Sequence, residues 1–255
     1  VKCYMSIVKC LRSNFMTEII PAIMPKDYED LVEKVNLFAG VVPLVQLDIM
    51  DGKFVPERTW PYPLGREPHF GAIVAEEEGM PAWEDIDFEV DLMIESPELA
   101  VPKWVSAGAR RIIVHVEGID PVRADGRIRP TSNGASFETI RASVPAGLIE
   151  LGLAINTATP VSALDPYLDR IDFVQCMGIA RIGFQGEAFD ERVLEHIKSL
   201  RALRPEMPIS IDGSVNFETA KRLVDAGATR LVSGSAILDS EDIVGAVETF
   251  KDLVQ

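Results

Sequence analysis

The sequence contains few cysteines and no long apolar run, and each of these absences excludes a class of protein. Only Cys3, Cys10 and Cys176 are cysteines among 255 residues. An odd number without motif spacing excludes a disulfide framework, so we expect a reducing compartment, the cytoplasm. No stretch approaches the roughly 20 consecutive apolar residues of a membrane span, so no membrane partner is expected.

Positive charge is also scarce. The chain has 25 Lys and Arg residues against 40 Asp and Glu, a net charge of −15 at pH 7. Because phosphate backbones are held by clustered Lys and Arg, this balance excludes nucleic acid as a partner. A small anion is still compatible, since backbone N–H groups at helix N-termini and glycine turns supply local positive potential.

Short apolar runs alternate with segments of helical period along most of the chain. The runs lack clean polar alternation, which is typical of parallel strands buried on both faces. Strands are predicted at 19–24, 41–50, 87–94, 111–116, 149–155, 172–178, 209–211 and 230–235. Helices are predicted at 27–39, 98–109, 190–203, 217–228 and 240–254.

This alternation predicts an α/β fold of the (β/α)8 TIM-barrel type, a single domain over residues 16–255. An open doubly wound sheet is the alternative. Residues 1–15 are interpreted as a disordered extension. The long connections 57–87 and 118–135 follow strand ends, so we interpret them as candidate lids over the C-terminal face or as surface decoration.

Carboxylates stand at the ends of three predicted strands. Gln46, Asp48 and Met50 share the face that points into the barrel, and Asp91 and Asp212 occupy corresponding strand ends. An isolated buried carboxylate is costly, so three together favour a functional site over turn capping. Converging carboxylates either share a proton or hold a cation.

Glycine-rich turns follow the last three predicted strands. Glycine lets backbone N–H groups approach an anion, and phosphate sites after the seventh and eighth strands recur in this fold. We therefore predict a site for a small phosphorylated substrate. Its candidate residues are Gly183, Gly186, Gly213, Ser214, Gly234 and Ser235.

From about residue 19 onward the chain resembles the ribulose-phosphate 3-epimerase family. The matching segments are LDIMDGKFVP (47–56), VDLMIESPE (90–98), VHVEG (114–118), LGLAINTATP (151–160), IDGSVNFETAKRLVDAGA (211–228) and LVSGSAI (231–237). The resemblance implies a barrel of the ribulose-phosphate-binding type. It also implies an isomerase of carbohydrate metabolism that epimerises C3 of a ketopentose 5-phosphate, as between ribulose and xylulose 5-phosphate, through an enediolate.

The resemblance also implies roles for particular residues. Asp48 and Asp212 map onto the acid–base pair that acts from opposite sides of the substrate carbon. The methionines around the intermediate map onto Met50, Met93 and Met177. His115 is a candidate substrate contact, with a structural histidine as the alternative.

The chain departs from the family pattern at the metal. The family uses two histidines and two aspartates, and the histidine positions here are Gln46 and Asp91. The expected ligands are therefore Gln46, Asp48, Asp91 and Asp212, an oxygen set that favours Mn or Mg over Zn or Fe. The strand 1 serine is replaced by Ala22.

Three functions are compatible with these residues. A sugar-phosphate epimerase leads, because both aspartates are retained. A lyase or decarboxylase on the same scaffold would be supported by a lysine at a strand end, and none stands there. A non-catalytic or degenerate sugar-phosphate binder would explain the lost histidines, although Gln and Asp remain capable ligands. A homo-oligomer is compatible with the sequence, but no motif identifies an interface.

Overall fold

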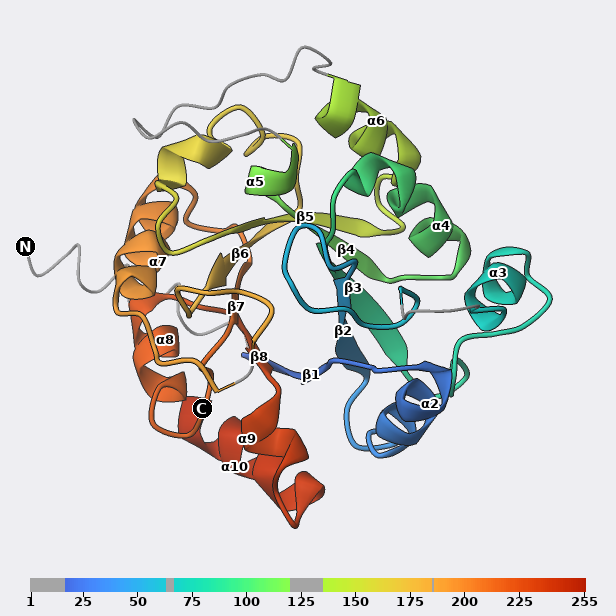
Figure 1. Ribbon diagram of the computed structural model, residues 1–255. Helices are drawn as coiled ribbons and strands as arrows, with labels where there is room; N and C mark the ends of the chain where they lie inside the picture. Colours follow the sequence, from blue (N-terminus) through green and yellow to red (C-terminus); the bar gives the residue numbers. More distant parts are fainter. Residues whose placement is uncertain (1–16, 63–66, 120–134, 185) are drawn as a thin grey trace, which may run out of the picture.

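Eight parallel strands form a closed barrel with the helices outside it (Figure 1). The computed structural model describes residues 17–62, 67–119, 135–184 and 186–255. Each strand pairs with the next, and β8 pairs with β1. The strands are β1 (Glu18–Ile23), β2 (Leu44–Met50), β3 (Asp87–Met93), β4 (Arg111–His115), β5 (Glu150–Ile155), β6 (Phe173–Met177), β7 (Ile209–Asp212) and β8 (Arg230–Ser233).

Helices of different length connect the strands. The α-helices are α2 (Tyr28–Asn36), α3 (His69–Val74), α4 (Val101–Ser106), α5 (Val116–Ile119), α6 (Ala135–Ser143), α7 (Arg192–Leu203), α8 (Ala220–Ala226), α9 (Ser235–Leu238) and α10 (Ile243–Val254). The described residues also include two 3-10 helices, η1 (Pro97–Leu99) and η2 (Val161–Leu164). None of the described helices is long and apolar enough to cross a membrane.

The predicted (β/α)8 barrel is confirmed, and the open sheet is excluded by the closed strand order. Two strand boundaries are wrong by two residues or more, and the others agree within one residue. Residues 41–43 lie in the turn before β2, and the eighth strand ends at Ser233, where Gly234 caps the short helix α9. The predicted helix over 98–109 is divided into η1 and α4, with a proline in the first turn of α4.

Burial on both faces explains the apolar strand sequences. All seven residues of β2 are buried. Leu47 and Ile49 pack outward in the same core cluster as Leu31 and Val35 of α2, whereas Gln46 and Asp48 alternate inward. The strand therefore buries apolar side chains on its outer face and directs polar ones toward the barrel axis.

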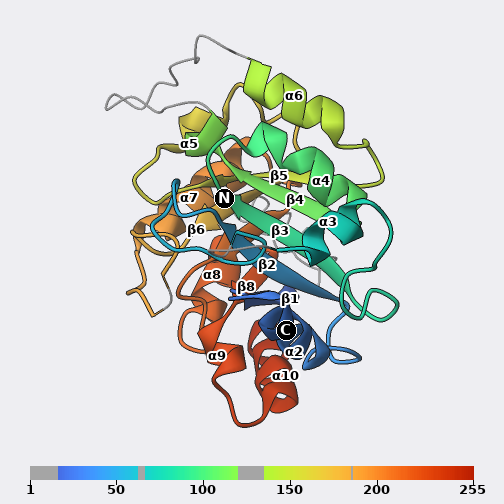
Figure 2. The ribbon, with the colours of Figure 1, turned by 45° about the vertical axis from the view of Figure 1, so that its right-hand side comes forward.

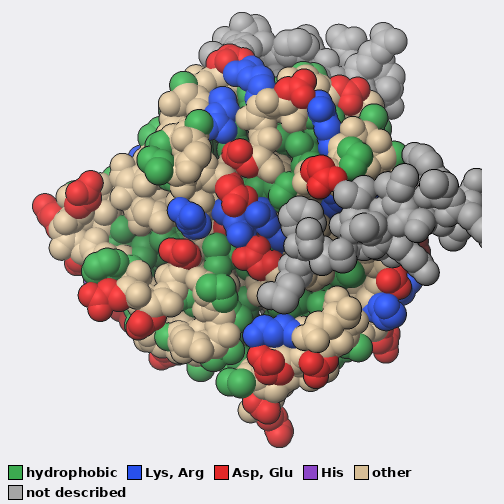
Figure 3. Space-filling view, turned by 180° about the vertical axis from the view of Figure 1, so that it is seen from behind, with side chains coloured by type: hydrophobic (Ala, Val, Ile, Leu, Met, Phe, Trp, Pro, Cys, Tyr) green, Lys and Arg blue, Asp and Glu red, His purple; other side chains and the backbone are tan. Residues whose placement is uncertain are grey.

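Ion pairs fill the N-terminal mouth of the barrel. Arg111 contacts Glu89 at 3.0 Å and Glu18 at 2.9 Å, and Arg230 contacts Glu150 at 2.8 Å. On the face behind that of Figure 1, basic side chains lie directly beside acidic ones near the middle (Figure 3). The charged groups offset one another at this end, while the other end carries the cavity described below.

The connection after β2 packs against the barrel in part. Trp60 is fully buried and makes edge-to-face contacts with Phe70 and with Trp104 of α4. Helix α3 then lies beside α4 on the outside of the barrel (Figure 2). The described parts of the 57–87 connection thus include a segment fixed by aromatic packing.

Several expectations fall on residues outside the described ranges. The extension predicted over residues 1–15 lies there, as do 63–66 and most of the 118–135 connection, at 120–134. Of the three cysteines, Cys176 is described, and it is a buried free thiol.

Candidate active site

Three carboxylates from three strands converge inside the barrel. Asp48 of β2, Asp91 of β3 and Asp212 of β7 each offer an oxygen atom within 4.8 Å of the others. Asp48 and Asp91 are direct neighbours in the parallel ladder. The amide Nε2 of Gln46 donates to Asp48 Oδ1 at 2.8 Å and to Asp212 Oδ2 at 2.9 Å. One amide therefore ties the two predicted acid–base aspartates together.

Burial and mutual repulsion change the proton affinities of this cluster. Burial raises the pKa of Asp48 well above its ordinary value, and the charges of Asp212 and Asp91 raise it further. Burial also raises the pKa of Asp212 to about 7, with Asp91 adding to the rise and the Gln46 hydrogen bond opposing it. Carboxyl groups that titrate near neutral pH are suited to accepting and returning protons.

Asp91 is held by a second set of polar side chains. Gln175 Nε2 donates to Asp91 Oδ2 at 3.1 Å, and Ser210 Oγ donates to Gln175 Oε1 at 3.2 Å. His115 Nε2 lies 3.2 Å from Asp91 Oδ1, and His115 Nδ1 lies 3.7 Å from Glu117 Oε2. Burial lowers the pKa of His115, but Asp91 and Glu117 outweigh it and bring the pKa to about 10. An imidazolium therefore offsets the charge of Asp91.

The residues present fit a hard divalent cation. Among the described residues, the buried Oε1 of Gln46 has no hydrogen-bond partner. Rotating the Gln46 side-chain amide by half a turn exchanges Nε2 and Oε1. In that orientation Oε1 would point between Asp48 and Asp212. Together with Asp91, these residues offer oxygen donors alone, the set that suits Mn²⁺ or Mg²⁺.

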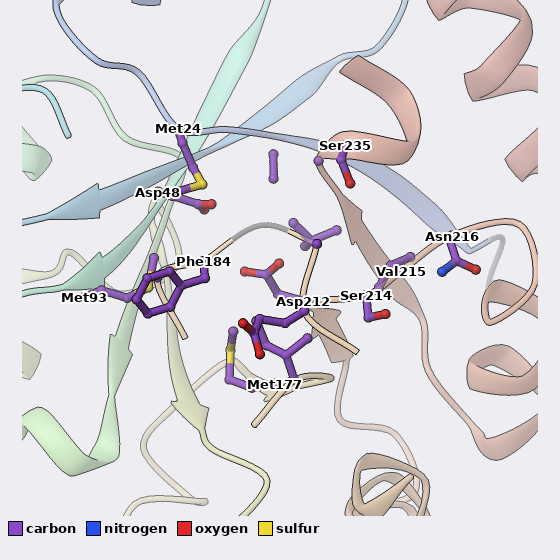
Figure 4. A pocket seen from close by; sticks show the side chains of 18 residues that line it. Met24, Asp48, Met93, Met177, Phe184, Asp212, Ser214, Val215, Asn216 and Ser235 are labelled. Atoms are coloured by element: carbon purple, nitrogen blue, oxygen red, sulfur yellow. The ribbon is translucent and has the colours of Figure 1, made fainter. Parts of the chain in front are cut away.

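A cavity of about 240 Å³ opens above Asp48 and Asp212. Figure 4 shows both carboxylates directed into it, with Met24, Met93 and Phe184 on one side. All six predicted phosphate-site residues line it, namely Gly183, Gly186, Gly213, Ser214, Gly234 and Ser235. The glycine turns and the aspartates thus belong to one site.

Two of the predicted substrate contacts, Met50 and His115, are not among the described residues that line the cavity. Met93 and Met177 line the cavity, but Met50 is fully buried and packs against Val55 and Met93. His115 is 1% exposed and lies between Asp91 and Glu117. Its contacts with two carboxylates fit the structural alternative, and its role as a substrate contact stays a prediction.

Backbone conformation shapes the glycine-rich end of the cavity. Gly213 has φ of 98°, and a Cβ there would lie 2.8 Å from a side-chain carbon of Ile179. The next residue, Ser214, also has a positive φ, of 53°. Thr219 holds this turn by donating to the Ser214 carbonyl at 2.8 Å and accepting from the Asn216 N–H at 3.0 Å.

Sequence reasoning missed several residues of the site. Phe184, Glu187 and Asn216 line the cavity, and Glu187 forms an ion pair with Arg181 on the same loop. Gln175 and Ser210 were also missed, although each is a polar residue within a buried apolar strand. That pattern is the signal that could have identified the last two.

Comparisons with known proteins show the family of this chain. The sequence model of the ribulose-phosphate 3-epimerase family matches residues 18–238. The ribulose-phosphate 3-epimerase of Bacillus subtilis is 28% identical over 92% of this chain and 99% of its own length. Ribulose-phosphate 3-epimerase 1 of Cupriavidus necator is 31% identical over 89% and 86%.

Solved structures share the fold at lower identity. A 3-hexulose-6-phosphate synthase is 17% identical, with a TM-score of 0.62 over 93% of this chain and 100% of that chain. The orotidine 5'-phosphate decarboxylase of Pyrococcus horikoshii is 17% identical, with a TM-score of 0.58 over 92% and 98%. At such identities the likeness concerns the barrel alone. Since the family match covers most of the sequence, the chain belongs to the ribulose-phosphate 3-epimerase family.

Proposed function

We propose that this protein epimerises C3 of a ketopentose 5-phosphate, interconverting D-ribulose 5-phosphate and D-xylulose 5-phosphate. The observation that carries the proposal is the pairing of Asp48 and Asp212 in one cavity with the glycine-rich turns. Family membership supports the same substrate class, because the matched relatives bear the name of this activity.

The two aspartates would divide the proton transfer between them. An ionised carboxylate accepts the C3 proton, which leaves an enediolate with a planar C3, and the partner carboxyl returns a proton from the other side. Without a bound cation, burial raises the pKa of Asp212 to about 7, so both of its forms are present at neutral pH. Without a bound cation, Gln46 donates to both carboxylates and so fixes their spacing; with a cation bound, the flipped amide would offer its oxygen instead.

A metal ion would assist this step. Gln46, Asp48, Asp91 and Asp212 are the residues that would hold it, and we favour Mn²⁺ or Mg²⁺. When bound, such an ion polarises a carbonyl and stabilises the negative charge that proton removal creates.

The phosphate would lie at the glycine-rich end of the cavity. Gly213, Ser214, Gly234 and Ser235 line that end. The Gly213 N–H serves the Asp212 carboxylate, so the backbone N–H groups of Ser214, Gly234 and Ser235 are the donors we assign to the phosphate. The described residues that line the cavity include no lysine, so a lyase that needs an amine nucleophile is less well supported than an epimerase.

The first experiment is an epimerase assay on chelated protein. We expect D-ribulose 5-phosphate turnover to return with Mn²⁺ or Mg²⁺ and to be weaker with Zn²⁺ or Fe²⁺. Asp48→Asn and Asp212→Asn should each lower kcat by about 100-fold or more, because each removes a proton-transfer group. Circular dichroism checks that both variants remain folded.

The opposite result is equally clear. If no metal restores turnover, the protein is not an epimerase of this substrate. Calorimetry with D-ribulose 5-phosphate then separates the remaining cases, since binding without turnover indicates the non-catalytic sugar-phosphate binder.

A further inference from the structure

The segment after β2 returns to the end of that strand through one threonine. Thr59 Oγ1 donates to the backbone carbonyl of Asp48 at 2.7 Å and accepts from the N–H of Met50 at 2.9 Å. The Thr59 N–H also donates to the Met50 carbonyl at 3.0 Å. The side chain of Thr59 is 3% exposed. Three hydrogen bonds thus fix the two residues on either side of Ile49.

These bonds occupy a place where the sheet offers no strand partner. The ladder between β1 and β2 ends at the pair of Ile23 and Leu47, whereas the ladder with β3 continues to Met50. Trp60, next to Thr59, donates its N–H to the Pro25 carbonyl just beyond β1 at 2.8 Å. Residues 59 and 60 therefore bridge the ends of β1 and β2 where direct pairing stops.

The bridge itself is held by the packing of Trp60. The indole is fully buried and contacts Phe70 and Trp104 edge to face, with Tyr28 as a tilted neighbour. A side chain packed on three sides leaves Thr59 little freedom to move.

We propose that Thr59 is a positioning residue for Asp48, a role that rests on the function proposed above. By holding the Asp48 carbonyl and the Met50 N–H, its hydroxyl fixes the strand end from which the Asp48 carboxylate projects toward Gln46. Proton transfer requires placement within about half an ångström, so loosening this end should slow the chemical step more than it weakens binding.

The chain offers a matched control at the opposite mouth of the barrel. Thr229 Oγ1 accepts from the Ile209 N–H at 3.0 Å and donates to the Ile209 carbonyl at 3.3 Å. Its hydroxyl thus makes the same kind of backbone bridge, at the start of β7 and away from the cavity lining. Removing the Thr229 hydroxyl removes two hydrogen bonds to the backbone, as in Thr59, but leaves the residues of the cavity unchanged.

The test compares Thr59→Val, Thr59→Ser and Thr229→Val. We expect Thr59→Val to lower kcat on D-ribulose 5-phosphate by about 10- to 100-fold with KM within about twofold, since angstrom-scale misplacement has effects of this size. Thr59→Ser, which keeps the hydroxyl, should restore kcat. Thr229→Val should lower Tm without changing kcat.

Crystal structures of the same variants give a readout that does not depend on turnover. The Asp48 carboxylate should leave its hydrogen bond with Gln46 in Thr59→Val and keep it in Thr59→Ser. An unshifted Asp48 in Thr59→Val, or a kcat equal to that of the wild type, overturns the proposal. Absence of wild-type turnover would instead refute the proposed function, and the Asp48 position would still decide the role of Thr59.

Discussion

At the scale of single residues, the central feature is a set of buried acids whose carboxylate oxygens lie within 4.8 Å of one another. Asp48 and Asp212 are both buried, and Gln46 is the amide that holds them together. A group with a raised pKa in the folded state binds its proton more tightly there than in the unfolded chain. Its ionisation therefore opposes folding as pH rises.

This reasoning predicts a pH-dependent gain in stability for Asp212→Asn. The ordinary pKa of an aspartate is about 4, and that of Asp212 in the folded protein is about 7. As the pH rises from about 4 to 7, the wild type should therefore lose stability relative to the variant. In chelator, Asp212→Asn should therefore have the higher Tm at pH 8 and a similar Tm at pH 4. Thermal denaturation followed by circular dichroism measures both.

The exposed Asp165 supplies the control, since Asp165→Asn should leave Tm nearly unchanged across the same range. Addition of Mn²⁺ at pH 8 should give the wild type a higher Tm than Asp212→Asn, because a ligand stabilises the protein that binds it. If Asp212→Asn has a lower Tm than the wild type in chelator at pH 8, then burial and the charge of Asp91 do not destabilise ionised Asp212.

At the scale of elements, the ends of β6 and β7 meet with no room for a side chain. The N–H of Gly178, just after β6, donates to the Asp212 carbonyl at 2.6 Å. A Cβ at Gly178 would lie 2.1 Å from the carbonyl oxygen of Gly213. Glycine at this position lets the strand that carries Asp212 approach its neighbour.

We therefore expect Gly178→Ala to damage both stability and catalysis. Overpacking of this kind costs about 1–3 kcal/mol, and the shift should also displace Asp212 and lower kcat. Urea denaturation and the epimerase assay test the two effects separately.

Gly71 in α3 is the comparison, because it is exposed and a Cβ there meets nothing within 4 Å. Gly71→Ala should raise stability by up to about 1 kcal/mol through helix propensity, with kcat unchanged. If the two alanine variants behave alike, crowding at Gly178 is not the cause.

At the scale of the whole molecule, the barrel has two polar ends with different chemistry. The N-terminal mouth pairs its acids with Arg111 and Arg230, whereas the C-terminal face leaves a cavity above Asp48 and Asp212. Glu89 is 1% exposed and depends on Arg111 for its partner. The ion pairs at the N-terminal mouth stabilise the fold, and the candidate active site lies at the opposite end of the barrel.

Arg111→Met should therefore destabilise the protein strongly. At pH 8, above the pKa of about 7 to which burial raises Glu89, removing Arg111 leaves that buried carboxylate without its ion-pair partner, which costs about 3–5 kcal/mol. Lys198→Met is the control, because its pair with Glu195 is more than half exposed on both side chains and is worth under about 1 kcal/mol. Similar losses for both variants in urea denaturation would show that the mouth is not a stabilising cluster.

The sequence by itself determined the eight-stranded barrel and the inward position of its acids. Both follow from local pattern, because apolar runs mark strands buried on both faces and alternation assigns Gln46 and Asp48 to one side. The glycine-rich turns could also be predicted from local sequence, because a positive φ at a single residue favours glycine there. Strand ends were less certain, as at residues 41–43 and 234–235, because the residues that stop a ladder lie on other strands.

Contacts between side chains on different strands depend on the tertiary structure. Asp91 contacts Gln175 of β6 and His115 of β4. Nothing in the sequence separation of Asp91 from either residue indicates these contacts. The same closure of the barrel places His115 beside Asp91 and returns Thr59 to the end of β2. Periodicity assigns a side chain to a face, whereas its partner across the barrel is set by strand register and closure, which bring distant segments together.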